Sequence, residues 1–195
     1  SKIDFTELIS LFLYFKIINL KQFKMRIESI SIENFKVFKE TFIKDLPRMA
    51  VLLGTNGSGK SSFFDVFGFL SDCLQNNVTI ALNKRGGFSE VISRGADINK
   101  DQIKFEIKFR NEQIGNERPP LITYSISIGS KNGKAFISRE ILKYRRGQRT
   151  GKPWHFLDFR SGEGYAIENE DEYGQEGVEE KRINQKVTNP DILAI

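Results

Sequence analysis

Apolar and polar side chains alternate over residues 25–33, where Ile27, Ile30 and Ile32 are separated by charged and hydroxyl-bearing residues. A two-residue period is typical of a strand that has one face in a protein core. The pattern continues in similar style over residues 35–43, and Pro47 then interrupts it. The alternation therefore predicts a strand in each of these two segments.

A different pattern follows, because residues 49–53 are apolar without any alternation. Such a run is expected of a strand that is covered on both faces, so we place it at the centre of a sheet. Glycines punctuate the chain from there to Gly59. Large apolar side chains then recur at helical spacing, which predicts a helix from about Lys60 to Leu74.

The second half of the chain has the pattern of an antiparallel sheet. Residues 84–87 are typical of a loop, and apolar residues then alternate with polar ones over residues 103–109, 121–128 and 135–144. Asn132 and Gly133 indicate a hairpin turn between the last two segments. Shorter strands are expected at residues 154–159 and 165–167, and the strands with their one helix predict the α/β class.

The bulk composition fits one folded domain. The chain has 195 residues, of which 39% are hydrophobic and 17 are Phe, and this is enough to bury a core. The single cysteine, Cys73, excludes an intramolecular disulfide and favours a cytoplasmic setting. Residues 8–20 are apolar but contain Lys16 and are fewer than the ~20 that a membrane-spanning helix needs, so no membrane partner is expected.

Charge is distributed unequally along the chain. Residues 163–180 hold eight acidic residues and no Lys or Arg, which predicts a flexible acidic loop. Residues 1–162 hold 27 of the 30 basic residues and 16 of the 25 acidic ones, so their net charge is +11 and suits an anionic partner.

The domain pattern opens at Met25, so residues 1–24 are either an extension, native or not, or an added element packed on the core of a domain at 25–195.

The strongest chemical motif is Gly-Thr-Asn-Gly-Ser-Gly-Lys-Ser at residues 54–61, which matches the P-loop pattern G-x-x-x-x-G-K-[ST]. The glycines permit a nest of backbone N–H groups around a phosphate chain, and the following helix adds its positive end. A lysine here can reach the β- and γ-phosphates, and Ser61 is the expected Mg²⁺ ligand. We therefore predict that ATP and Mg²⁺ bind at Gly54, Thr55, Asn56, Gly57, Ser58, Gly59, Lys60, Ser61 and Ser62.

Residues 54–62 resemble the P-loop of ABC-type ATPases, in particular the SMC, RecF and related predicted-ATPase branch of AAA family ATPases. Residues 27–38 are similar to the opening strand and Asn-Phe-Lys element of that branch. The resemblance implies a P-loop NTPase, the N-terminal lobe of an ABC-type head, with a central sheet, a P-loop helix and an added antiparallel β subdomain. It also implies that Lys36 touches phosphate and that Phe38 lines the base site. The alternative is an exposed lysine and a core phenylalanine on an ordinary strand.

Several elements of that family have no counterpart in the sequence. No apolar run ending in Asp-Glu follows the P-loop, and neither a Leu-Ser-Gly-Gly-like motif nor a clear Q-loop glutamine is present. The only histidine, His155, stands in an unrelated context and is interpreted as structural. In the family these elements lie in a C-terminal half, so the resemblance implies an N-terminal fragment or split half and leaves the catalytic residues unassigned. It further implies that the partners are that C-terminal half, a second head that dimerises with the first on ATP binding, and DNA during its maintenance, repair or defence.

Other functions stay open at this point. GTPases recognise guanine with the pattern Asn/Thr-Lys-x-Asp, and residues 83–86 do not match it because Gly86 stands where Asp is required. A nucleotide or small-molecule kinase and a scaffold that binds ATP without turnover remain alternatives. Cys73 fits a small buried residue better than a nucleophile. A basic cluster fits either nucleic-acid backbone contacts or a solvated strand end, and it comprises Arg139, Lys143, Arg145, Arg146, Arg149 and Lys152.

Overall fold

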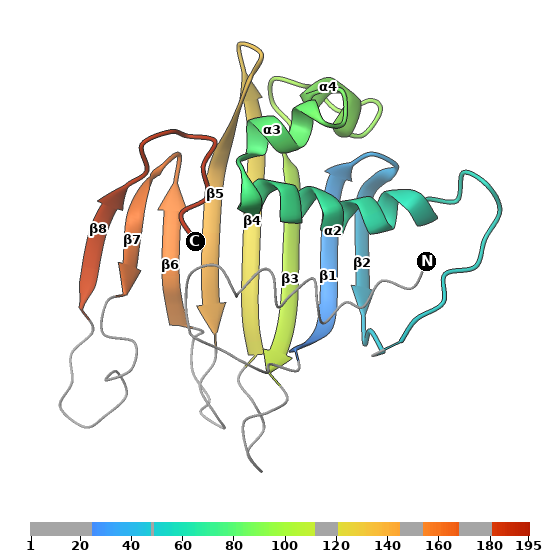
Figure 1. Cartoon of the computed structure of the whole chain (residues 1–195), viewed down its shortest axis with the longest axis horizontal. Coiled ribbons are helices and arrows are strands. Elements are labelled where there is room, and N and C mark those ends of the chain that lie inside the picture. The colour runs from blue at the N-terminus through green and yellow to red at the C-terminus, as the bar shows by residue number, and fades with distance from the viewer. Residues whose placement is uncertain (1–24, 48, 112–120, 145–153, 168–180) are drawn as a thin grey trace.

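One antiparallel sheet of eight strands forms the body of the protein, and its helices lie against one face (Figure 1). The computed structural model describes residues 25–47, 49–111, 121–144, 154–167 and 181–195. The strand order is β2-β1-β3-β4-β5-β6-β7-β8. The strands are β1 (Met25–Phe35), β2 (Phe38–Lys44), β3 (Ile103–Asn111), β4 (Leu121–Lys131), β5 (Lys134–Tyr144), β6 (Trp154–Arg160), β7 (Glu163–Ile167) and β8 (Arg182–Lys186), and the helices are α2 (Lys60–Gln75), α3 (Val78–Asn83) and α4 (Phe88–Val91).

The core lies between the sheet and α2, which crosses β4, β3, β1 and β2 in Figure 1. Alternate residues of β3 and β4 pair across the strands on the buried face, as in Phe105 opposite Ile126. From α2, Phe69 packs against Phe35 and Phe105, with ring centroids 5.5 and 5.8 Å apart. Because every second strand residue meets the helix, the two-residue period of the sequence becomes the core face of the sheet.

Most of the expected elements are confirmed. The helix begins at Lys60 as predicted and extends one residue beyond Leu74, and the alternating segments form β1 and β3 to β7. The strand expected at residues 35–43 is β2, which begins only at Phe38 because residues 36–37 form a turn. In the β4–β5 hairpin, Asn132 and Gly133 have φ values of 53° and 75°. Both values are positive, as a type I′ turn requires, so the Asn-Gly dipeptide sets this turn.

The prediction of a buried central strand at residues 49–53 is wrong. These residues form no strand, and the side chains of Met49, Val51 and Leu53 are 78%, 74% and 88% exposed. An apolar run becomes a buried strand only where neighbouring strands pair with it, and no strand of the described residues does so. The described strands also form one continuous sheet, rather than a central sheet with an added antiparallel subdomain.

The expected acidic loop at residues 163–180 is wrong at its start. Glu163–Ile167 is strand β7, which pairs with β8 through contacts that include Lys186 Nζ and Glu163 Oε1 at 2.6 Å. The basic residues of β8 balance the charge of β7, so the acidic composition does not prevent a strand here. Residues 168–180 and residues 1–24 lie outside the described part of the chain, and both predictions for them stay predictions.

A buried glutamate fastens residues 189–195 to the core. Glu140 on β5 is 1% exposed and accepts hydrogen bonds from the backbone N–H groups of Ala194 (2.6 Å) and Ile195 (3.3 Å). It also accepts one from the Tyr124 hydroxyl (3.0 Å), and burial together with this carboxylate raises the pKa of Tyr124 well above its usual range. The segment is joined to α3 as well, since Val78 N–H donates to the carbonyl of Asp191 at 2.9 Å.

Replacing Glu140 with alanine should therefore destabilise the fold. The substitution leaves the buried hydroxyl of Tyr124 and two partly buried backbone N–H groups without this acceptor, which should lower the free energy of unfolding by roughly 2–4 kcal/mol. Urea unfolding followed by circular dichroism measures the change. Glu163→Ala is the matched control, because its exposed pair with Lys186 contributes little. Equal unfolding midpoints for the two variants would contradict the anchoring role of Glu140.

Candidate functional site

The P-loop leads into α2, and its geometry leaves the start of that helix open. Gly57 and Gly59 have φ values of 84° and 90°, which glycine adopts without strain. Gly59 is the N-cap, no side chain caps the helix, and the first turn carries no acidic residue. The first backbone N–H groups of a helix have no partner within it, so this end presents donors and a positive dipole to an anion.

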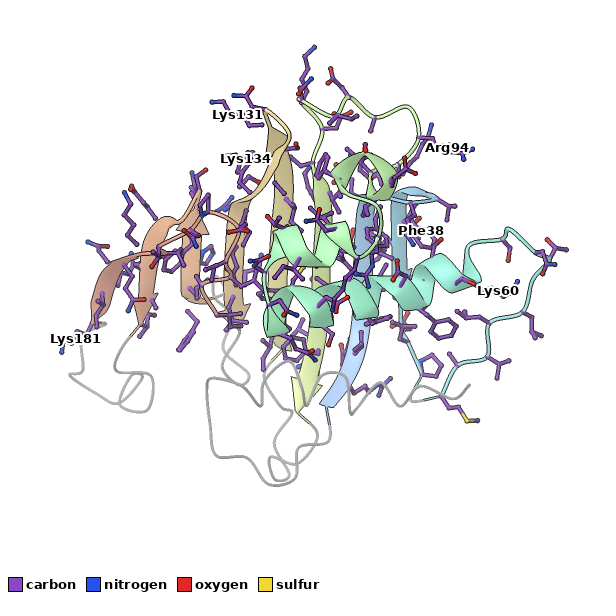
Figure 2. The ribbon with its side chains drawn as sticks, turned by 45° about the horizontal axis from the view of Figure 1, so that its top comes forward. Phe38, Lys60, Arg94, Lys131, Lys134 and Lys181 are labelled. Atoms are coloured by element: carbon purple, nitrogen blue, oxygen red, sulfur yellow. The ribbon has the colours of Figure 1, made fainter. Side chains whose placement is uncertain are left out.

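The Lys60 ammonium lies inside the loop that precedes it. Lys60 Nζ donates to the carbonyl oxygens of Gly54 and Thr55, each at 2.7 Å, and to Ser58 Oγ at 3.2 Å. These acceptors are neutral, so a phosphate oxygen would be a stronger partner for the same ammonium. Figure 2 shows Lys60 at the end of α2 next to this loop. The loop and the lysine together therefore fit a phosphate group.

Close contacts at Gly54 and Gly59 leave no room for a larger side chain unless neighbouring atoms shift. A Cβ atom at Gly54 would lie 2.5 Å from Ser58 Oγ, and a Cβ atom at Gly59 would lie 3.1 Å from Val37 Cγ2. The second contact also shows that the β1–β2 turn packs against the P-loop. The ring of Phe38 lies on the same side, with its nearest atoms 3.5 Å from that Cβ position.

The residues present also fit a magnesium ion bound together with phosphate. Ser61 lies exposed in the first turn of α2, directly after Lys60. Magnesium in nucleotide sites is usually held by one or two protein oxygens, phosphate oxygens and waters, so a cluster of acidic ligands is not required. Within the described residues, no group of three or more His, Cys, Asp or Glu side chains is placed to hold a metal ion.

The turn that carries Lys36 is fixed by its backbone. Lys36 has a φ of 51°, and its N–H donates to the carbonyl of Val91 at 2.7 Å. On either side of it, Ser93 donates its N–H to the carbonyl of Asn34 (3.1 Å) and its hydroxyl to the carbonyl of Phe38 (2.8 Å). The segment after α4 therefore holds the Asn-Phe-Lys element beside α2, with Val37 and Phe38 next to Gly59. That Lys36 touches phosphate and Phe38 lines the base site stays a prediction.

An ion-pair network that the sequence analysis missed surrounds Lys36. Its Nζ lies 2.6 Å from Asp65 Oδ2, while Arg85 donates to Asp65 Oδ1 (2.9 Å) and to Asp72 Oδ2 (2.7 Å). Burial opposes ionisation of Asp72, but hydrogen bonds from Lys84 and Arg85 outweigh it and hold the pKa of that carboxyl below its ordinary value. The available signal was the seven-residue spacing of the two aspartates, which places them on one face of a helix.

Two further acids, Asp158 and Asp97, have partners away from the P-loop. Asp158 pairs with Arg139 (3.2 Å) and lies 3.5 Å from His155 Nδ1. It is on β6, whereas α2, which begins at Lys60, crosses β4, β3, β1 and β2 in Figure 1. Asp97 lies in an exposed turn, where the backbone N–H of Asn99 donates to it and lowers its pKa. The contact with Asp158 agrees with a structural role for His155.

The other sequence candidates fall outside the site. Cys73 is 1% exposed on α2, and burial raises the pKa of its thiol well above the usual range, so it is a buried core residue. In the basic cluster, Arg139 is paired with Asp158, and residues 145–152 lie outside the described part of the chain. None of the described helices has the length and apolar character needed to cross a bilayer.

Comparison with known proteins bears on the family of the chain. The model of a protein family described as "AAA ATPase domain" matches residues 25–183, which contain the P-loop, the β1–β2 turn and the strands up to the start of β8. No curated protein matches the sequence. Because the family match spans most of the chain and includes the P-loop described above, the chain belongs to the family of AAA ATPase domains.

Proposed function

We propose that this chain binds Mg-ATP through residues 54–61 and forms the N-terminal, nucleotide-binding lobe of an SMC/RecF-like ATPase of the ABC type. The observation that supports this best is the Lys60 ammonium, which lies among loop carbonyls at the uncapped start of α2. A triphosphate brings several negative charges to this point. It would replace two neutral carbonyl partners of the lysine with charged ones and accept from the open N–H groups.

The residues around the loop have separate parts in binding. Lys60 and the backbone N–H groups hold the phosphates, and Ser61 supplies one oxygen to Mg²⁺, which screens the phosphate charge when bound. Val37 and Phe38, which pack beside Gly59, offer an apolar side to the nucleotide. Ser62 follows in the same turn of the helix and adds its backbone N–H group.

Hydrolysis requires more than these residues. A water must be positioned and the metal supported, usually by a carboxylate close to the γ-phosphate. Among the described residues near the P-loop, Asp65 is engaged by Lys36 and Arg85. In our proposal the missing acid comes from a C-terminal half, and a second head closes the site when ATP binds.

The exposed apolar segment before the P-loop supports such a partner. The side chains of Met49, Val51 and Leu53 face solvent, and they lie directly before Gly54. Strands of a C-terminal half would cover them and place its acidic residues near the loop. The work of such a head, by its resemblance to this branch, is DNA maintenance, repair or defence in the cytoplasm.

Lys60→Ala should weaken Mg-ATP binding by roughly 10- to 100-fold, because it removes a charged hydrogen-bond donor from the phosphates. The loop is exposed, so the fold should remain intact. Isothermal titration calorimetry measures the affinity, and circular dichroism checks the fold. Lys131→Ala is the control, since that lysine lies at the hairpin tip away from α2 (Figure 2). Undiminished ATP affinity in the Lys60 variant would exclude the P-loop as the binding site.

Ser61→Ala should weaken the magnesium dependence of ATP binding, because it removes the expected protein ligand of the ion. The affinity for ATP is measured over a range of Mg²⁺ concentrations. Ser71→Ala, ten residues further along α2, provides a control that should keep the wild-type magnesium dependence. A Ser61 variant that keeps it too would show that Ser61 is not the ligand.

The chain alone should bind ATP but hydrolyse it very slowly. Loss of positioning and electrostatic contributions can each cost on the order of 10²–10³ in rate, so binding can persist while turnover nearly vanishes. Single-turnover hydrolysis at saturating Mg-ATP tests this, with Lys60→Ala as the control for contaminating ATPases. Added C-terminal half should restore activity. Robust Lys60-dependent turnover by the isolated chain would contradict the proposal, whereas no turnover even with that half would favour a scaffold that binds ATP without hydrolysis.

A further inference from the structure

Asp65 is an acidic residue in a part of α2 that should attract anions. It is the first acid of the helix and comes four residues after Ser61, which places it about 6 Å along the helix axis. A carboxylate there opposes the positive potential that the helix start and Lys60 provide. Other groups must therefore offset the negative charge of Asp65 at this position.

The two oxygens of Asp65 are held in different ways. Oδ1 accepts a hydrogen bond from Arg85 Nε at 2.9 Å. Oδ2 is shielded from solvent, and the Lys36 ammonium lies 2.6 Å from it, but no hydrogen bond of good geometry reaches that oxygen within the described structure. The contact with Lys36 is thus an ionic one without the alignment that the arginine bond has.

Arg85 is a fixed partner of Asp65, and Lys36 is a movable one. Arg85 donates also to Asp72 (2.7 Å) and to the carbonyl of Ala81 (2.9 Å), and its guanidinium lies 5.4 Å from the ring centre of Phe69. Its side chain is only 11% exposed, compared with 32% for Lys36. A lysine ammonium on a flexible four-carbon stem can change partners at little cost.

The backbone brings Lys36 within reach of both partners. Its N–H is tied to Val91, and the next residue, Val37, packs against Gly59 of the P-loop. The ammonium can therefore contact Asp65 on one side or a phosphate at the start of α2 on the other. If it moves, Asp65 Oδ1 keeps its hydrogen bond from Arg85, and only Oδ2 loses its ionic partner.

We propose that Asp65 is a positioning residue that holds the Lys36 ammonium one helical turn from the P-loop and competes with the nucleotide phosphates for it. The inference rests on the proposed function, since it assumes that phosphate binds at Lys60. Its consequence is a nucleotide affinity below the maximum that the site could give. Lys36 is released to the phosphates only when they are present.

Measuring Mg-ATP affinity tests this role. A competing Asp65 predicts tighter binding when it is replaced, whereas a purely structural Asp65 predicts weaker or unchanged binding. Asp65→Asn should tighten Mg-ATP binding by about 3- to 10-fold, the range expected when a partly exposed ion pair no longer competes. In a Lys36→Met background the same change should give less than half of that gain in free energy. Asp65→Glu keeps the charge and should bind ATP as the wild type does. Asp72→Asn perturbs the same arginine two turns further along the helix and should leave the affinity unchanged.

Lysine labelling tests the holding contact without any nucleotide. An amine-reactive acetylating reagent, followed by peptide mass spectrometry, measures the reactivity of Lys36. Labelling should increase in Asp65→Asn and stay at the wild-type level in Asp72→Asn. If wild-type protein binds no Mg-ATP, the proposed function fails, but this measurement still reports whether Asp65 holds the lysine.

Several results would overturn the inference. The first is weaker ATP binding by Asp65→Asn. The second is a gain in ATP affinity that is the same with and without Lys36, or the same in Asp72→Asn. The third is labelling of Lys36 that does not change when Asp65 is replaced. Circular dichroism establishes that each variant is folded. Should the asparagine variant unfold, Asp65→Ser takes its place, because its smaller side chain leaves Arg85 free to contact Asp72 alone.

Discussion

The packing of one aromatic ring, that of Phe69, fixes the position of the site relative to the core. The ring lies in the middle of α2, where it meets Phe35 from β1 and Phe105 from β3, and the guanidinium of Arg85 lies over it. Aromatic pairs at these distances add to the free energy gained by burying their area. Because Phe35 directly precedes Lys36, the same contact places the β1–β2 turn along the helix. The start of α2, the turn and the arginine are thereby fixed relative to one another.

Charge is arranged around this apolar contact so that the buried side chains of Arg85 and Glu140 are compensated. Arg85 joins two aspartates of α2, and its cost of burial is offset by hydrogen bonds to both carboxylates and to a backbone carbonyl. Glu140, at the other end of the core, is compensated by a hydroxyl and two backbone N–H groups. Lys60 differs, since its acceptors are loop oxygens at an exposed position. Of these three charged groups, only Lys60 lies at an exposed position, where an anionic ligand can reach it.

Sequence patterns predicted the parts of the structure that depend on local spacing. The alternation in β3, the helical stripe of α2 and the Asn132-Gly133 turn each follow from residues close together in the chain. The P-loop is of this kind, because its backbone geometry and its lysine lie within eight residues. Local spacing therefore identified the residues for which we propose phosphate binding.

The contacts that sequence reasoning missed join residues far apart in the chain. Arg85 is 20 residues from Asp65, and Glu140 is 54 from Ala194, so no periodicity connects them. The wrong assignment of residues 49–53 has a related cause. Whether an apolar run is buried depends on strands that pair with it, and those cannot be read from the run itself.

Residues 49–53 also connect nucleotide binding to the proposed partner. Fully burying a Val, Leu or Met side chain contributes about 1.5–3 kcal/mol, and Met49, Val51 and Leu53 are all largely exposed. The segment continues directly into Gly54 and Thr55, whose carbonyls hold Lys60. A C-terminal half that covered the segment would therefore also order the loop, and nucleotide would no longer bear that entropic cost on binding. Under the proposed function, partner and nucleotide then increase each other's affinity, because whichever binds first orders the loop for the other.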